Sequence, residues 1–303
     1  MKTNLHRVLL CIFVFVLGAA LSGCKKSGSD GPPRPESLNV LVPTASGVSV
    51  YGNDIVSIDA SNTSEGYVMV QYSGGVSKIK LQITNPDGTI YTYAMTAGGY
   101  LTFPLSGGSG YYQLDVLENV DADLYALAFS QGIDVTVKDE FTPFLYPNQY
   151  VWFTADSAAI AKGEEISGES TTDLNYIENV YNFVTQNIVY DNEKAANIAT
   201  DYIPNIDDTL SSGKGICFDY ASLMSAMLRS QGIPTKLEVG YSGSAYHAWI
   251  STYIKDVGWV DKIIEFDGQN WTLLDPTLAA NNDSSAVSEY IGDGSNYTVK
   301  YSY

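Results

Sequence analysis

The feature that most constrains the fold of this chain is a change of hydrophobic periodicity near its middle. From about residue 36 to 140, short runs rich in Val, Ile, Tyr and Phe alternate with period two and are separated by turn signals such as Pro86-Asp87-Gly88. These seven or so runs predict a small antiparallel β-sandwich of Ig-like shape: VMVQY, KIKLQIT, TIYTYAM, YLTFPL, YYQLDV, LYALAF and IDVTV. The many tyrosines invite a carbohydrate-binding interpretation, but Tyr also forms strands well, and plain sheet packing is favoured.

After residue 170 the apolar residues recur with helical spacing. A first amphipathic helix is predicted after Ser170-Thr171-Thr172, and a second runs from Cys217 to the stop signal Gln231-Gly232-Ile233-Pro234. Between them, residues 191–213 are expected to form a polar loop. Strand-like runs follow the second helix, with a hairpin around Asp267-Gly268. This half therefore predicts a mixed α+β domain.

The first 23 residues predict a signal peptide. Lys2 and Arg7 form a positively charged start, and an apolar stretch over 8–21 follows. That stretch is shorter than the roughly 20 residues that a helix needs to cross a bilayer. We therefore expect the segment to direct export and then to be removed.

The signal peptide ends in Leu21-Ser22-Gly23-Cys24, which resembles the lipobox of bacterial lipoproteins. The resemblance implies that Cys24 is lipidated and anchors an exported chain to the cell membrane or cell surface of a bacterium. Residues 24–38, rich in Gly, Ser and Pro, are then expected to form a flexible tether. The alternative is an ordinary secreted protein in which Cys24 happens to lie near the cleavage site.

The composition excludes several partners. The chain has 34 acidic and 16 basic residues, which gives a net charge of −18. Loss of the signal peptide removes two basic residues and no acidic residue, so the mature chain is still more acidic. Such a chain repels nucleic acid, so no nucleic-acid partner is expected. With Cys24 used for the lipid, the processed chain keeps one free thiol, Cys217, and one imidazole, His247, which offer no zinc-ligand spacing. The Gly-rich stretches lack the Lys-Ser/Thr ending of a P-loop, so no metal or cofactor is expected.

Three residues could form a site for thiol chemistry. Cys217 follows Gly213-Lys214-Gly215 at a predicted helix start, where free N–H groups, the helix dipole and Lys214 favour a thiolate. His247 begins a predicted strand and could act as the base that a thiol requires. Asp275 ends a later strand, from which its carboxylate could orient the imidazole ring. Taken singly, each also has a structural interpretation: a packed core cysteine, a satisfied histidine and an Asp-Pro turn.

Three blocks in this order resemble the core of transglutaminase-like domains, which have a papain-like thiol fold: GKGICFDYASLMSAMLRSQGIPTKLEVGY, HAWI and WTLLDPT. The resemblance covers roughly residues 170–280. It implies that Cys217 is the nucleophile, His247 the general base and acid, and Asp275 the orienting carboxylate. The chemistry that it implies is attack on an amide of a protein or peptide, cell-wall peptides included. The thioacyl intermediate would pass to water or to an amine, and the sequence does not choose between them.

The expected chain is therefore of the α+β class and has four parts. They are a signal peptide (1–23), a tether (24–38), an Ig-like β-sandwich (39–145) and a transglutaminase-like, papain-like domain (146–303). A second hypothesis is a surface module that binds a glycan or a protein through the sandwich and carries a vestigial triad.

Some features of the site are expected from this arrangement alone. His247 and Asp275 are 28 residues apart, so residues 255–268 are interpreted as an insertion that shapes the cleft. The two side chains are expected on neighbouring antiparallel strands, in a site that is open to solvent and has Trp249 or Trp271 near its wall. Either Gln186 or Tyr190 could supply an oxyanion-hole side chain, but no motif decides between them, and that role stays unassigned.

Overall fold

The computed structural model describes residues 34, 40–242, 244–255, 258–266, 271–273 and 297–303. The predicted signal peptide and Cys24 lie outside the described residues. Within them, no helix has both the length and the apolar character needed to cross a membrane.

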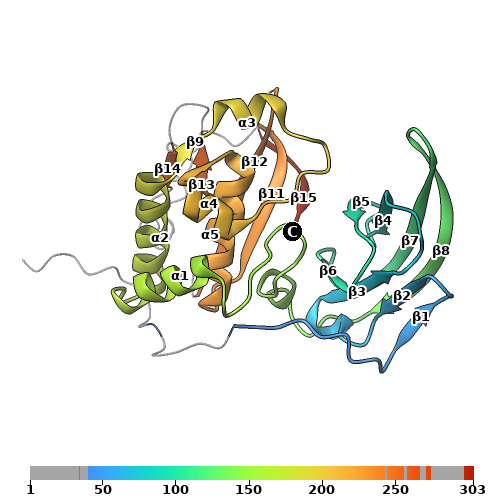
Figure 1. Ribbon diagram of the computed structural model, residues 1–303. Coiled ribbons are helices and arrows are strands. Elements are labelled where there is room, and N and C mark those ends of the chain that lie inside the picture. The colour runs from blue at the N-terminus through green and yellow to red at the C-terminus, as the bar shows by residue number, and fades with distance from the viewer. Residues whose placement is uncertain (1–33, 35–39, 243, 256–257, 267–270, 274–296) are drawn as a thin grey trace, which may run out of the picture.

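The alternating half of the sequence forms two four-stranded antiparallel sheets (Figure 1). The first has the order β1-β2-β3-β6, from β1 (Val50–Gly52), β2 (Val56–Asp59), β3 (Tyr67–Tyr72) and β6 (Leu101–Pro104). The second has the order β5-β4-β7-β8, from β4 (Ile79–Thr84), β5 (Ile90–Met95), β7 (Gly110–Asp121) and β8 (Leu124–Val135). Short 3-10 turns lie at η1 (Thr63–Glu65) and η2 (Thr142–Phe144).

The two sheets share one apolar core, which confirms the predicted sandwich. Ile58 and Val70 of the first sheet and Leu81 and Leu114 of the second are all fully buried in the same cluster. Full burial of such a side chain contributes about 1.5–3 kcal/mol. Burial of these inward-facing side chains is therefore what holds the sheets face to face.

One division of the predicted strands is wrong. The runs LYALAF and IDVTV were expected to be separate strands, but β8 continues through both, because it pairs with β7 along almost its whole length. The hairpin turn between β7 and β8 falls at Ala122, which has a positive φ of 42°. Strands β1 and β2 were not among the predicted runs.

Five tyrosines of the sandwich pack in its interior and at its junction with the second domain. Tyr67, Tyr72, Tyr91, Tyr93 and Tyr112 are all buried. The Tyr112 hydroxyl lies 2.8 Å from the Gly108 carbonyl oxygen, to which it donates. The interpretation as sheet packing therefore holds for these five residues.

The second half of the chain is an α+β domain. Its helices are α1 (Ala158–Gly168), α2 (Asp173–Asn187), α3 (Asn192–Asn197), α4 (Ile206–Ser212) and α5 (Cys217–Ser230). A five-stranded sheet has the order β14-β13-β12-β11-β15, from β11 (Thr235–Ser242), β12 (Ala245–Ile254), β13 (Gly258–Phe266), β14 (Trp271–Leu273) and β15 (Tyr297–Ser302). The parallel pair β9 (Val189–Tyr190) and β10 (Lys214–Gly215) lies apart from it.

Helix starts in this domain follow from side-chain caps. Thr172 accepts a hydrogen bond from the Asn175 N–H, as predicted for the first helix. The expected polar loop over 191–213 instead contains α3 and α4. Asp191 and Asn205 cap these two helices with their side-chain oxygens, and neither helix is long enough to show an apolar period.

Helix α5 lies at the centre of the domain. Every residue from Asp219 to Ser230 is buried, because α5 packs against α1, α2 and α4 and against strands β11 and β12. Its first turn is less enclosed, since Cys217 and Phe218 are only partly buried. The helix thus presents its N-terminal end, and not its middle, to the surroundings.

An aromatic cluster joins the two domains. Tyr150 of the connector packs on Tyr303 with ring centroids 4.6 Å apart, and Tyr303 packs on Tyr91 and Tyr93 of β5. Tyr150 also contacts Phe218, the residue after Cys217, at 5.3 Å. The sandwich is therefore packed against the part of the second domain that contains the thiol.

A buried arginine ties the same region together. Arg229 of α5 is 2% exposed, and its guanidinium donates to the main-chain oxygens of Thr235, Tyr146 and Tyr303. Burial lowers its pKa to about 9. Thr235 begins β11, Tyr146 belongs to the connector and Tyr303 follows β15, so one side chain links three segments.

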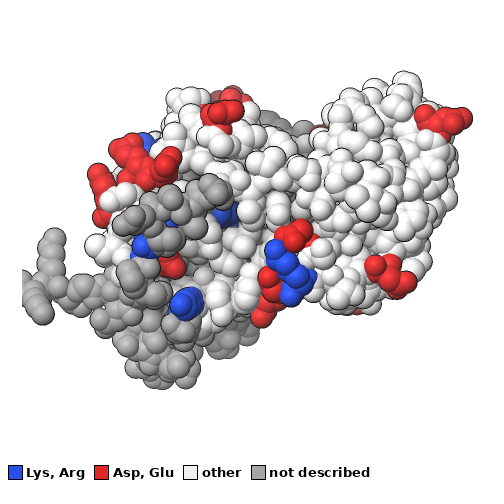
Figure 2. Space-filling view, turned by 90° about the horizontal axis from the view of Figure 1, so that it is seen from below, with Lys and Arg blue, Asp and Glu red and all other residues white. Residues whose placement is uncertain are grey.

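Arg34 is the single described residue of the predicted tether. Its guanidinium pairs with Asp173 at 2.8 Å, bonds Ser167 at 3.1 Å, and lies 4.1 Å from the centre of the Tyr176 ring. This point of the tether is therefore attached to helices α1 and α2. The face shown in Figure 2 has acidic side chains on both domains, and basic ones on the helical domain and near the junction.

Candidate active site

Cys217 is the first residue of α5, as the sequence predicts. The Gly-Lys-Gly segment before it is held by β9, because Val189 N–H donates to the Gly213 oxygen and Asp191 N–H donates to the Gly215 oxygen. Gly213 has a φ of +62°, which favours glycine. At Gly215 a Cβ would lie 2.7 Å from the Asp219 Cβ, so no side chain fits.

A buried carboxylate organises the helix start. Asp219 is fully buried and accepts a hydrogen bond from the Ile216 N–H at 2.9 Å, which closes the first turn. Lys194 donates to the same oxygen at 2.6 Å, and the Tyr202 hydroxyl donates to the other. Sequence reasoning missed this cluster, although an acidic residue three positions after the cap is a known signal.

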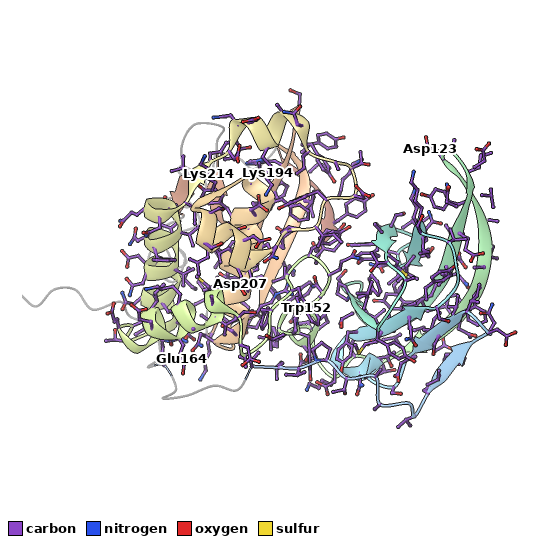
Figure 3. The ribbon with its side chains drawn as sticks, viewed as in Figure 1. Asp123, Trp152, Glu164, Lys194, Asp207 and Lys214 are labelled. Atoms are coloured by element: carbon purple, nitrogen blue, oxygen red, sulfur yellow. The ribbon has the colours of Figure 1, made fainter. Side chains whose placement is uncertain are left out.

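The lysine whose side chain pairs with the helix start is Lys194, and not Lys214 as predicted. Lys214 has an exposed side chain, whereas Lys194 of α3 forms the ion pair with Asp219 (Figure 3). The cationic neighbour of the helix start therefore comes from the segment that was expected to be an unstructured loop.

Cys217 as a residue is partly exposed, unlike a packed core cysteine. Cys217 is free and of intermediate exposure, while Ala221, Met224 and Leu228 on the same helix face are buried. Burial of the sulfur by its surroundings raises the pKa of Cys217, while the N–H groups of Ala248 and Phe218 act in the opposite direction. The expected stabilisation of a thiolate at the helix start is thus outweighed by desolvation.

The strand that carries His247 lies against the thiol. The Ala248 N–H faces the Cys217 sulfur, and His247 is the preceding residue of β12, with a partly exposed side chain. Across the ladder His247 pairs with Gly240, where a Cβ would lie 2.0 Å from the Thr298 oxygen. The fold thus brings Cys217 and the His247 segment together.

Tyr190 is a further residue at the thiol. Its hydroxyl accepts from the Cys217 main-chain N–H and also contacts the Cys217 side chain. Burial raises the pKa of Tyr190, and the neighbouring Cys217 adds to the effect. Tyr190 reaches this position because it pairs with Gly215 in the β9–β10 ladder. Of the two oxyanion candidates, it is therefore the one with a contact to Cys217.

The third predicted residue, Asp275, lies outside the described residues. Strand β14 ends at Leu273, and β13 separates it from β12. We expected the strand that precedes Asp275 to be a neighbour of the His247 strand, but β13 lies between the two. The reason is that much of the presumed insertion 255–268 is β13 itself, a regular strand paired with β12.

Trp249 does not line an open wall. It is fully buried, and its indole N–H donates to Glu238 at 2.8 Å. Ser251 donates to the same carboxylate oxygen at 2.6 Å. This tryptophan therefore fixes β12 against β11 from within the sheet.

A family model agrees with this arrangement. The model described as the transglutaminase-like superfamily matches residues 160–262, about a third of the chain. Residues 160–262 form a transglutaminase-like domain. Cys217 and His247 lie inside the matched segment of this domain, and Asp275 lies beyond it.

Relatives of the transglutaminase-like domain are distant. A UPF0252 protein of Methanocaldococcus jannaschii is 33% identical over 96 residues, which is 28% of this chain and 27% of the relative. The chain thus spans about a quarter of that curated protein.

Three solved structures are also similar. A candidate cysteine protease from Cytophaga hutchinsonii has a TM-score of 0.35 and 15% identity, covering 84% of this chain and 74% of that one. A candidate protease from Parabacteroides distasonis has a TM-score of 0.29 and 12% identity, covering 66% of this chain and 61% of that one. Red sea bream transglutaminase has a TM-score of 0.26 and 14% identity, covering 72% of this chain and 48% of that one.

Proposed function

We propose that this protein is a cell-envelope enzyme in which Cys217 attacks amide bonds of proteins or peptides. The observation that carries the proposal is the position of the thiol: partly exposed at the start of α5, next to Ala248 on the His247 strand and in contact with Tyr190. The partial exposure of Cys217 gives a substrate access to it, and we take His247, the residue before Ala248, as the base that a thiol requires.

The reaction then proceeds in two stages. His247 takes the Cys217 proton as the sulfur bonds to the carbonyl carbon, and the resulting oxyanion receives hydrogen bonds from main-chain N–H groups at the helix start and the Tyr190 hydroxyl. His247 returns the proton to the departing amine, which leaves a thioester on Cys217. Water or a second amine attacks the thioester, His247 accepts its proton, and the thiol is restored with release of an acid or a new amide.

Because burial raises the pKa of Cys217, the resting thiol is neutral at pH 7. His247 therefore acts at the moment of attack, as a general base, and does not hold a preformed thiolate. The role of Asp275 is to orient the imidazole, as the family resemblance implies. Access of water or amine to the thioester decides between hydrolysis and acyl transfer.

Alkylation by iodoacetamide tests the thiol and its base. In a chain that begins at residue 25, where Cys217 is the sole cysteine, His247→Ala should slow labelling at pH 7 by about tenfold or more, since no base then takes the thiol proton as the sulfur attacks. The variant should recover only as the pH rises past the raised pKa of the thiol. Tyr246→Ala, on the same strand and 57% exposed, is the matched control. Equal rates for the His247 variant and wild type across the pH range would refute the assignment of the base.

The anchor is a separate proposal, supported by the lipobox-like sequence at Cys24. Expressed in a bacterium, the full chain should sediment with membranes and enter the detergent phase on phase separation. Cys24→Ser should move most of the protein to the aqueous fraction, because loss of the acyl chains removes about 0.8 kcal/mol per buried CH₂. Ser22→Ala serves as the control. Membrane retention of the Cys24 variant would exclude lipid anchoring at this residue.

A further inference from the structure

A cleft of about 1020 Å³ lies between the sandwich and the transglutaminase-like domain. Lys80 and Tyr125 belong to its sandwich wall, and residues from 200–207, in the connection from α3 and the first turn of α4, form part of the other wall. Trp152 of the connector lies between the two domains (Figure 3) and is 46% exposed. A large apolar ring left open in such a cleft is typical of a surface that receives a ligand.

Two polar groups in the cleft lack partners among the described residues. Gln149 is 8% exposed, and its side-chain nitrogen donates to the Ala94 carbonyl, but its Oε1 is buried without a hydrogen bond. Thr102 is 1% exposed, and its Oγ1 is likewise unpaired. Buried groups of this kind are rare in native proteins, because each has lost its water without replacement. Both residues line the cleft, so a bound molecule could supply the missing partners.

The cleft is connected to the thiol through its walls. Tyr202, between the lining residues Asp201 and Ile203, donates to Asp219 at the start of α5. Tyr150, between Gln149 and the segment that carries Trp152, contacts Phe218. The segments that line the cleft therefore adjoin two residues that contact the start of α5.

The charges in the cleft favour a polypeptide. Lys78 and Lys80 lie on the sandwich wall, while Asp201 and Asp207 lie opposite. Lys80 is held 4.0 Å above the Tyr125 ring. Walls of both signs suit a chain with charged side chains and main-chain donors and acceptors, whereas a neutral glycan offers no charge to pair with either wall.

We propose that this cleft binds an extended stretch of the substrate polypeptide next to the amide that Cys217 attacks. A main-chain N–H of that stretch bonds Gln149 Oε1, Thr102 Oγ1 pairs with a second main-chain group, and an apolar side chain packs on Trp152. The protein therefore prefers unfolded polypeptides to small amides. This inference rests on the proposed function for the chemistry at Cys217, but the binding itself can be measured without turnover.

The test uses the full chain in detergent with Cys217→Ala, and fluorescein-labelled dimethylcasein as an unfolded polypeptide. Fluorescence anisotropy should show saturable binding, and Trp152→Ala should weaken it by about tenfold or more. Tyr111→Ala is the matched control, because Tyr111 is an exposed aromatic residue of the sandwich that does not line the cleft. Its dissociation constant should equal that of the parent.

A second variant separates ligand binding from folding. Thr102→Val keeps the shape of the side chain and removes the unpaired hydroxyl, so it should keep or raise the melting temperature of the free protein. It should nevertheless weaken dimethylcasein binding several-fold. A residue with only a structural role would change the melting temperature without changing binding.

The outcomes are distinct. Equal dissociation constants for Trp152→Ala and Tyr111→Ala would overturn the cleft proposal. The proposal would also be overturned if chitohexaose bound in a way that depends on Trp152 while dimethylcasein did not bind, because the occupant would then be a glycan. If dimethylcasein binds as expected but the Cys217 protein acts neither on it nor on a glutamine dipeptide with hydroxylamine, the proposed function fails while the binding site stands.

Discussion

Replacing Cys217 by Ala is expected to lower turnover of dimethylcasein by a factor of about 10⁴ or more. A nucleophile forms a covalent bond in the reaction, so no neighbouring group can substitute for it, and losses of this size are typical when one is removed. Both possible products should disappear together, since hydrolysis and acyl transfer share the thioester. Peptide release and incorporation of dansylcadaverine measure the two routes.

The comparison requires that the variant keep its fold. Cys217 lies in the first turn of α5 and is only partly buried, so alanine should change the free energy of unfolding by less than about 1 kcal/mol. Ser46→Ala, at an exposed position before β1 of the sandwich, provides a substitution of similar size away from the thiol. Residual turnover above a tenth of the wild-type rate in the Cys217 variant would show that the chemistry occurs elsewhere.

Arg229→Met is expected to lower the free energy of unfolding by about 3 kcal/mol or more. The guanidinium makes three hydrogen bonds to main-chain oxygens in a fully enclosed position, and a bond to a charged group contributes about 1.5–3 kcal/mol. Methionine fills similar space but removes the charged donor from all three oxygens, of which the Tyr303 oxygen keeps a hydrogen bond from the Leu237 N–H. The melting temperature should fall by roughly 6 °C or more.

An opposing effect limits the size of this loss. Burial lowers the Arg229 pKa to about 9, so the charged form is costly to enclose, and an apolar replacement relieves that cost. The relief would dominate only if the partners were replaced as well, whereas here they are backbone groups that remain. Lys162→Met on the surface of α1 is the control, with an expected change within about 0.5 kcal/mol. A change below about 1 kcal/mol for Arg229→Met would show that water reaches the three oxygens.

The regular parts of the fold could be predicted because their signals are periodic. Strands such as β4, with Ile79, Leu81 and Ile83 inward, and helix α5, bounded by Gly215 and Gly232, follow directly from spacing and turn residues. The long strand β8 was divided in two because Ser130, Gln131 and Gly132 interrupt its apolar pattern. Its pairing with β7, a tertiary effect, overrides that local signal.

The site was predictable where a residue type and a helix start coincide, and less so elsewhere. Cys217 and His247 stand out in the sequence, whereas the contact of Tyr190 depends on a two-residue ladder that has no period to detect. Lys194 and Tyr202 reach Asp219 from 25 and 17 residues away. The raised pKa of the thiol also depends on burial by distant segments, so the spacing of local residues could not reveal it.

The position of β15 has a consequence for the order of events as the chain is made. Its residues, Tyr297–Ser302, pair with β11, and Ser302 bonds the same Glu238 that holds Trp249 beside His247. A ribosome releases β11 and β12 long before β15, whereas the residues of β1–β8 are already complete by then. The sheet behind the thiol therefore closes only after residue 302 has emerged, so a growing chain carries Cys217 without a finished site. We therefore expect Cys217 to gain its full reactivity only after synthesis has passed β15.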